Sequence, residues 1–270
     1  MIYRPKIACF LTAGYTEVNA LKGFFRKINA NVDYIQLCPA AQRRSKDSIR
    51  RRHVDSICTS QSGMTGDDLI DFAVGFIKKD AFLREEYSAI IIEDDKDDRF
   101  LKASDDGYGS IDLDSWFAFK EKVENRITSI TSIPVLILMA APEVESWFYA
   151  DYANGFGYVY MDELGSERGN TFSVRFKNYI KSRILTYRYA DDIEAYGIKN
   201  GSYSKLSVEI QEALESIDFA DYLNFETGLK YSKRDEGERM LNAINPDVVK
   251  DVCTVFFAPF YWALKELDFS

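Results

Sequence analysis

The stretch AIIIEDDKDD, residues 89–98, joins an apolar run directly to a dense set of acidic residues. Four apolar residues in succession indicate a strand that is buried on both faces, as in parallel sheets. Two other apolar runs, residues 7–11 and 134–139, are also followed within a few positions by acidic residues. Ligands of open α/β sheets bind beyond the carboxyl ends of the strands. We therefore expect these acidic side chains to gather at one edge of a sheet.

These acidic residues are candidate metal ligands, because carboxylates are the natural ligands of Mg²⁺ and Mn²⁺. The predicted ligands are Glu17, Asp94, Asp95, Asp97, Glu143 and Glu145. Simpler explanations stay open. Thr16 and Glu17 can cap a helix, and Glu143 and Glu145 suit a first helical turn, where the helix dipole favours negative charge. The acidic run at 93–98 can also be a solvated loop.

The pattern along the chain indicates the α/β class. Strands are predicted at 6–12, 32–37, 87–92 and 134–139, and helices at 16–29, 67–80, 112–129 and from Pro142 to about 153. Strands that alternate with helices indicate βαβ units, and hence a mainly parallel sheet of about four strands flanked by helices. A loop is predicted at 94–111.

After Gly155 the sequence pattern becomes helical, with no strand predicted. Helical stretches are expected at 172–189, 205–214, 219–225, 237–244 and 246–267. The sequence therefore predicts an α/β domain at 1–155 and a helical C-terminal region at 156–270, with the junction at 154–157.

Composition excludes several kinds of chemistry. The chain has one histidine, His53, and four cysteines without a Cys-x-x-Cys pair, which disfavours catalytic triads and zinc sites. The net charge of −9 argues against general attraction to nucleic acid. No apolar run approaches the roughly 18 residues that a membrane span needs, and no secretory cleavage site follows the N-terminus. A cytoplasmic protein without a membrane partner is expected.

One basic stretch, residues 42–53, interrupts this acidic background. It could bind the phosphates of a nucleic acid, and a solvated loop is an equal alternative. The candidate side chains are Arg43, Arg44, Lys46, Arg50, Arg51 and Arg52.

The order of these motifs resembles that of the Toprim-like nucleases. The resemblance is carried by Gly-x-Thr-Glu at 14–17, the acidic cluster at 93–98, the sequence PEVESWFYAD at 142–151, and Tyr231-Ser232-Lys233 before an aromatic-containing terminal helix. The branch that it resembles is an uncharacterised bacterial family related to the OLD-type and RloB-type phage-defence proteins. The resemblance covers residues 7–151, and 229–270 more loosely, but not 156–228.

This resemblance implies a Toprim-like fold and metal-dependent hydrolysis of phosphodiester bonds in DNA or RNA, transfer RNA included. Two Mg²⁺ or Mn²⁺ ions would lie at the site, with Glu17 and Asp94 in catalysis and Lys233 as a contact to the transition state. It also implies a role in anti-phage defence with a separate ABC/OLD-type ATPase, because the chain lacks a Gly-x-x-x-x-Gly-Lys-Ser/Thr phosphate loop. A homodimer is compatible with it.

The sequence departs from this family at Ala13, where the family's first motif carries a catalytic glutamate. Either Glu17 and the 93–98 cluster suffice for catalysis, or the protein is impaired, or Ala13 is an engineered inactivating change. A second hypothesis is therefore a catalytically inactive, Toprim-derived binding or regulatory subunit. A third is a small-molecule phosphohydrolase with an aspartate nucleophile from the 94–98 run.

Overall fold

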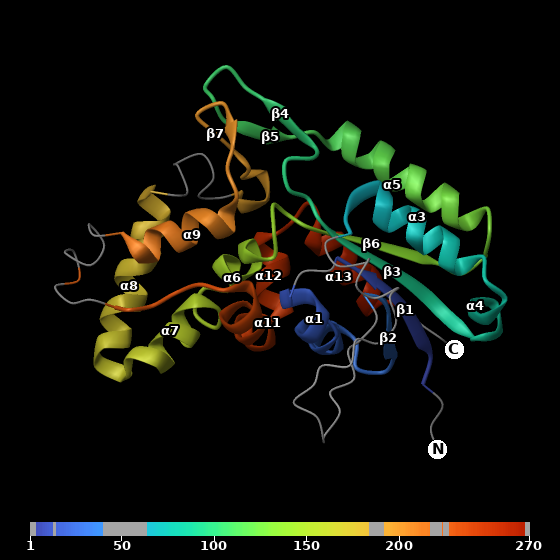
Figure 1. Ribbon diagram of the computed structural model, residues 1–270, viewed down its shortest axis with the longest axis horizontal. Coiled ribbons are helices and arrows are strands. Elements are labelled where there is room, and N and C mark those ends of the chain that lie inside the picture. The colour runs from blue at the N-terminus through green and yellow to red at the C-terminus, as the bar shows by residue number, and fades with distance from the viewer. Residues whose placement is uncertain are drawn as a thin grey trace, which may run out of the picture.

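A four-stranded parallel sheet forms the centre of the protein, with strand order β2-β1-β3-β6 (Figure 1). The computed structural model describes residues 4–12, 15–39, 64–183, 192–216, 223 and 227–267. The strands are Lys6–Leu11 (β1), Asp33–Cys38 (β2), Tyr87–Asp95 (β3) and Val135–Ala140 (β6). The predicted α/β class and parallel sheet are confirmed.

Helices flank this sheet and make up most of the C-terminal half. Those of the first half are α1 (Tyr15–Ile28), α3 (Gly66–Ile77), α4 (Asp80–Arg84), α5 (Leu113–Thr128) and α6 (Glu145–Ala150). The later helices are α7 (Phe156–Leu164), α8 (Ser166–Arg183), α9 (Leu206–Glu215), α11 (Glu238–Ala243), α12 (Pro246–Val252) and α13 (Phe257–Lys265). Two short turns of other helix types are η2 (Ile193–Ala195) and the π-helical η3 (Lys233–Gly237).

Two small hairpins lie outside the main sheet. The first pairs β4 (Leu101–Ala103) with β5 (Gly109–Ile111), inside the segment predicted as a loop. The second pairs β7 (Ile198–Lys199) with β8 (Ser202–Tyr203), in the half where no strand was predicted. Both are too short to give a clear period-two pattern in the sequence. The helical character predicted for the C-terminal half is confirmed, and the β7–β8 hairpin is a short element within it that was not predicted.

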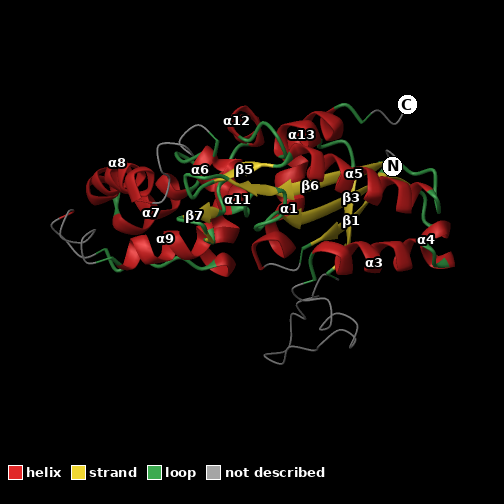
Figure 2. Ribbon diagram, turned by 90° about the horizontal axis from the view of Figure 1, so that it is seen from above, coloured by secondary structure: helices red, strands yellow, loops and turns green. Residues whose placement is uncertain are grey.

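Alternating side chains divide the core into two layers. Ile7, Cys9 and Leu11 of β1 face one layer, which contains α1 and the C-terminal helices. Ala8 and Phe10 face the other layer, which contains α3, α4 and α5. Figure 2 shows the strands between α3 on one side and α13 on the other. Burial of both faces explains the continuous apolar runs of the sequence.

The core is continuous across residue 155. Helix α13 packs against β6, and α11 packs against α1, so the last helices complete the layer over one face of the sheet. Helices α7, α8 and α9 lie further out, beyond α6 (left in Figure 1). The sequence pattern changes from alternating strands and helices to helices at residue 155. The buried layer on the α1 side of the sheet, however, contains side chains from before and after that residue.

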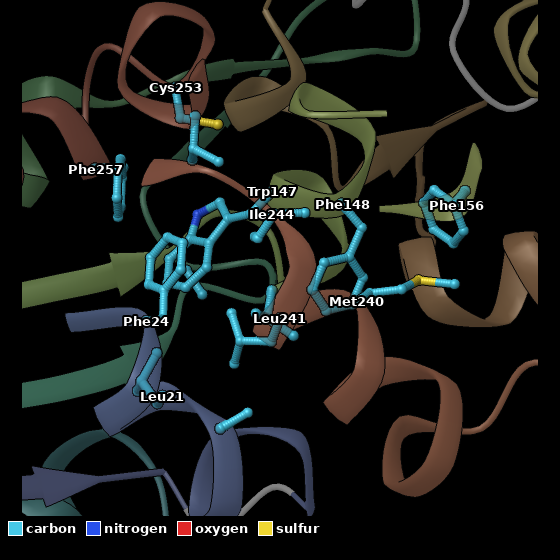
Figure 3. Packing of buried hydrophobic residues seen from close by; sticks show 14 of the residues in the cluster. Leu21, Phe24, Trp147, Phe148, Phe156, Met240, Leu241, Ile244, Cys253 and Phe257 are labelled. Carbon is cyan, nitrogen blue, oxygen red and sulfur yellow. The ribbon is translucent and has the colours of Figure 1, made fainter. Parts of the chain in front are cut away.

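Trp147 lies at the centre of this shared layer (Figure 3). Its ring is fully buried, 5.4 Å from the Phe24 ring of α1 and 5.1 Å from the Phe257 ring of α13, measured between centroids. The PEVESWFYAD segment thus has an apolar anchor directly after its two glutamates. Packing of Trp147 fixes the position of Glu143 and Glu145 at the edge of the sheet.

Candidate functional site

The site begins just after β3, where the backbone of residues 96 and 97 still pairs with the chain at the end of β6. The backbone N–H of Lys96 donates to the carbonyl of Ala140 (2.8 Å), and that of Asp97 donates to the carbonyl of Pro142 (2.9 Å). The pairing of β3 with the chain after β6 therefore continues to Asp97, where the backbone turns with a φ of +49°. This pairing brings Asp97 next to the segment that carries Glu143 and Glu145.

Asp97, Glu143 and Glu145 form a carboxylate cluster that is linked by two lysines. The Nζ atom of Lys233 lies 3.6 Å from Glu143 Oε2 and 3.6 Å from Glu145 Oε1. The Nζ atom of Lys205 lies 3.4 Å from Asp97 Oδ1 and 4.0 Å from Glu143 Oε1. Glu143 is thus the central carboxylate, with one lysine on each of its oxygens.

Burial makes these charges depend on one another. Glu143 and Glu145 are both 0% exposed, and an isolated ionised carboxylate is costly in such surroundings. Glu143 Oε2 accepts a hydrogen bond from the backbone N–H of Ser207 (3.2 Å), but its Oε1 has no hydrogen-bond donor among the described residues. Glu145 accepts a hydrogen bond from the hydroxyl of Tyr231. Between them, the two lysines place a positive charge next to each of the three carboxylates.

Asp94 has a different set of partners. It accepts hydrogen bonds from Arg99 Nη2 (2.6 Å), the backbone N–H of Gly66 (2.9 Å) and the Thr12 hydroxyl (3.3 Å). Burial raises the pKa of Asp94, and the charge of Arg99 opposes that shift. Gly66 begins α3, so Asp94 faces the α3 side of the sheet. No contact that the structure describes joins Asp94 to Glu145.

Thr12 marks the switch point of the sheet. In chain order the strands are arranged 2-1-3-4, so the connections leave β1 and β3 in opposite directions. The backbone N–H of Thr12, just after β1, donates to Glu93 Oε2 at 3.0 Å, and its hydroxyl reaches Asp94. Hydrogen bonds from Thr12 to Glu93 and Asp94 therefore join the ends of β1 and β3 at the switch point. The carboxylate cluster lies beside this point, at the end of β6.

Several predicted site residues fall outside this geometry. Glu17 belongs to α1, but its side chain is not among those that the structure describes, and Asp95 ends β3 with its Oδ1 atom buried. Outside the described residues lie Ala13 and the whole basic stretch, Arg43, Arg44, Lys46, Arg50, Arg51 and Arg52. The structure thus connects Asp97, Glu143, Glu145 and Lys233 and gives Asp94 other partners.

Sequence reasoning missed Lys205, Tyr203 and Arg99. Lys205 and Tyr203 come from the segment 156–228, for which no motif was available, and reach the site only through the β7–β8 hairpin. Arg99 follows the acidic run directly. A buried carboxylate such as Asp94 needs a cation as its partner, and Arg99 is close to it in sequence. Such a pairing could have been read from the sequence.

Glu143 and Glu145 lie close enough to share one cation, which in the structure is the ammonium group of Lys233. Within residues 4–12, 15–39, 64–183, 192–216, 223 and 227–267, no three Asp, Glu, His or Cys side chains form a group that could hold a metal. Mg²⁺, however, often uses only one or two carboxylates and completes its shell with water and substrate phosphates. Glu143 and Glu145 share one ammonium group, and Glu143 Oε1 has no hydrogen-bond donor in that part of the chain. This pair of oxygen ligands suits such an ion.

Another buried carboxylate, that of Glu194 in η2, binds the backbone at the start of α13. It is 1% exposed and accepts backbone N–H bonds from Val255 (2.6 Å), Phe256 (3.0 Å) and Phe257 (3.2 Å). These bonds begin a new helix and explain why the predicted helix at 246–267 is two helices. Burial raises the pKa of Glu194 to about 7, although the three N–H groups oppose that shift.

Lys96 is a buried cation, and Glu194 is one of the charges that affect its pKa. Its side chain is 0% exposed, and its Nζ atom donates to the carbonyl of Asp97 at 3.1 Å. Burial lowers the pKa of Lys96 to about 7, and the charges of Asp97, Asp98 and Glu194 oppose that shift. Burial raises the pKa of Asp192, and the charge of Lys96 opposes that shift.

We expect Glu194→Gln to change the pH dependence of stability. Because the pKa of Glu194 is raised from 4.5 to about 7 on folding, its favourable contribution is complete below pH 4.5 and is lost as the pH rises to about 7. Across that range the wild type should lose on the order of 3 kcal/mol relative to the glutamine variant. Melting temperatures of both proteins from pH 4 to 8 measure this difference.

Asp68→Asn, the same carboxylate-to-amide change at an exposed position of α3, is the control for the substitution itself. If the curves of Glu194→Gln and wild type run parallel over the whole range, Glu194 does not titrate in this way.

Comparison of the chain with protein-family models, with curated proteins and with solved structures found no match. Fold and site together define an α/β protein that carries buried carboxylates and lysines at the carboxyl edge of a parallel sheet. None of the described helices combines the length and the apolar character of a membrane span.

Proposed function

We propose that this protein is a divalent-metal-dependent nuclease of the Toprim type, which hydrolyses phosphodiester bonds of DNA or RNA. The observation that carries the proposal is the pair Glu143 and Glu145, both fully buried, which share the ammonium group of Lys233. The order of sequence motifs supports the same reading. By that resemblance, the protein acts in anti-phage defence together with a separate ATPase.

Each side chain of the cluster then has a distinct task. Glu143 and Glu145 would hold Mg²⁺ or Mn²⁺, and the ion would supply activation of a water and charge stabilisation at the phosphate. Lys233, whose Nζ atom lies 3.6 Å from both carboxylates, places a positive charge where negative charge develops on the phosphate oxygens. Glu143 and Glu145 are 0% exposed, and electrostatic interactions are stronger in such buried surroundings than in water.

The geometry disfavours Asp94 and Asp97, two of the four aspartates of the 94–98 run, as nucleophiles. Asp94 is 2% exposed and already accepts three hydrogen bonds, one of them from Arg99. Asp97 accepts a hydrogen bond from the Tyr203 hydroxyl (2.8 Å) and faces Lys205. A carboxylate that is engaged in this way is a weak nucleophile. A metal-dependent hydrolase therefore accounts for the site better than a phosphoenzyme mechanism.

Digestion with added metal tests the proposal. Plasmid, single-stranded DNA and total RNA are incubated with the protein and Mg²⁺, Mn²⁺ or Zn²⁺, with and without a partner ATPase. We expect cleavage with Mg²⁺ or Mn²⁺, and a higher melting temperature with the same two ions, because the ligands are all oxygen atoms. Zn²⁺ should give neither effect.

Ala13→Glu is assayed in parallel, because the related nucleases carry a glutamate at that position. The added carboxylate should increase cleavage, whereas Ala13→Gln, which keeps the shape without the charge, should not. If every form is inactive on every substrate and neither ion changes the melting temperature, the alternative holds: a binding or regulatory subunit without turnover.

A further inference from the structure

We propose that Tyr203 and Lys205 form a contact site for single-stranded nucleic acid beside the carboxylate cluster. The ring of Tyr203 stacks on a base, and the ammonium group of Lys205 binds a neighbouring phosphate. The inference rests on the proposed nuclease function and adds the form of the substrate, a single strand, and the residues that hold it. Neither residue belongs to a motif of the sequence.

Both side chains are fixed to the same carboxylate. The Tyr203 hydroxyl donates to Asp97 Oδ1 at 2.8 Å, and the Lys205 Nζ atom lies 3.4 Å from the same oxygen. Tyr203 is nevertheless 37% exposed, and the Lys205 side chain is 50% exposed. Tyr203 and Lys205 are thus both accessible to solvent, next to a cluster whose Glu143 and Glu145 are fully buried.

The ammonium group of Lys205 retains its capacity to donate. In the described part of the structure it makes two ion pairs, at 3.4 and 4.0 Å, but no hydrogen bond. An ammonium group has three donors, and a phosphate offers acceptor oxygens for them. Lys199 on the neighbouring β7 differs, since it donates to both oxygens of Glu209, at 3.4 and 3.2 Å. Lys199 is therefore a structural ion pair, and Lys205 is suited to bind a ligand.

The β7–β8 hairpin holds Tyr203 in place before any ligand binds. The backbone N–H of Gly201 donates to the carbonyl of Gly107 in the β4–β5 hairpin (2.8 Å), and Figure 1 shows the two hairpins next to each other. Ser204 donates from its backbone to the carbonyl of Gly197 (2.9 Å) and from its hydroxyl to Glu209 (2.7 Å). A ring fixed in this way loses little freedom when a base stacks on it.

An aromatic ring next to a cation is the usual device for binding single strands. Every base has a face that can stack, so such a contact tolerates any sequence, and the cation follows the backbone. In a duplex the bases are stacked on each other and their faces are covered. The combination therefore favours a single strand, or an end or loop with unpaired bases, over an intact duplex.

Binding in the absence of metal tests this inference separately from cleavage. Fluorescence anisotropy is measured in EDTA with a labelled single-stranded DNA, an RNA of the same sequence and the matching duplex. We expect Tyr203→Leu to weaken single-strand binding about tenfold and Tyr203→Phe to have a smaller effect, because the ring remains. Lys205→Met should weaken binding about fivefold, and Lys205→Arg should restore most of it.

The salt dependence of the binding constant distinguishes loss of a phosphate contact from a structural defect. Loss of one phosphate contact should make the slope of log K against log salt shallower by about 0.7 for a single strand. Lys205→Met should show this change. The control variants Lys120→Met, a partly exposed lysine of α5, and Tyr158→Leu, an exposed tyrosine of α7, should keep both the affinity and the slope of the wild type.

The outcomes separate the two proposals. If the protein cleaves nucleic acid while Tyr203→Leu and Lys205→Met bind like the controls, the contact site is refuted and the nuclease stands. Should binding depend on Tyr203 and Lys205 although no metal supports cleavage, the contact site stands and the nuclease is refuted. A wild type that binds neither single strand, or prefers the duplex, refutes the contact site.

Discussion

Glu143→Gln should lower metal-dependent cleavage by about a hundredfold or more while the protein stays folded. Glutamine keeps the shape of the side chain and can still accept the hydrogen bond from Ser207, but it removes the negative charge between Lys205 and Lys233. Loss of one charged group at such a site commonly costs two or more powers of ten in rate. Single-turnover cleavage rates with Mg²⁺ and Mn²⁺ measure the effect.

Glu209→Gln is the matched control for this variant. Glu209 also accepts hydrogen bonds from a lysine and a serine, Lys199 and Ser204, but it makes no contact with the carboxylate cluster. It should retain cleavage within a few-fold of wild type. If Glu143→Gln and Glu209→Gln cleave equally well, Glu143 is not a ligand of the reactive centre. Melting curves of both variants distinguish loss of chemistry from loss of the fold.

Trp147→Ala should have the largest effect on stability, a loss of about 3–5 kcal/mol in the free energy of unfolding. The ring is 0% exposed and packs between Phe24 of α1 and Phe257 of α13, so its removal leaves a cavity between three elements. Its Nε1 atom has no hydrogen-bond partner among the described residues. Trp147→Phe, which loses no hydrogen bond, should therefore cost only about 1–2 kcal/mol.

Denaturant unfolding of the three proteins gives these values directly. Trp262→Ala is a useful comparison, because Trp262 is 46% exposed and should cost less than about 1 kcal/mol. Equal losses for Trp147→Ala and Trp262→Ala would show that Trp147 does not anchor the core. A large loss for Trp147→Phe would show instead that the indole ring itself is needed there.

The sequence was sufficient to predict the sheet, because its signals are local. Unbroken apolar runs such as Ile90 to Ile92 belong to strands buried on both faces, and β1, β2, β3 and β6 lie within a residue or two of their predicted starts. Breaks in the C-terminal helices were not predictable in this way. The break before α13 depends on Glu194, which is distant in sequence and binds the N–H groups of residues 255–257.

The candidate site was predicted only in part for the same reason. Acidic residues at the ends of β3 and β6 are visible in the sequence, and the structure links Asp97 to Glu143. Of their cations, Lys233 was expected only from the motif Tyr231-Ser232-Lys233, and Lys205 was not expected, since it is separated from them by many residues and resembles a surface lysine. Asp94 shows the reverse case, because its partner Arg99 is close in sequence.

The shared layer between α1 and the last helices has a consequence for folding during synthesis. Chains commonly begin to fold from the N-terminus as they leave the ribosome. Here Leu21 and Phe24 of α1 gain their full set of neighbours only when α11 and α13 have been made. Until then an apolar surface of the nascent chain stays open to water, and it is a site where a chaperone would bind.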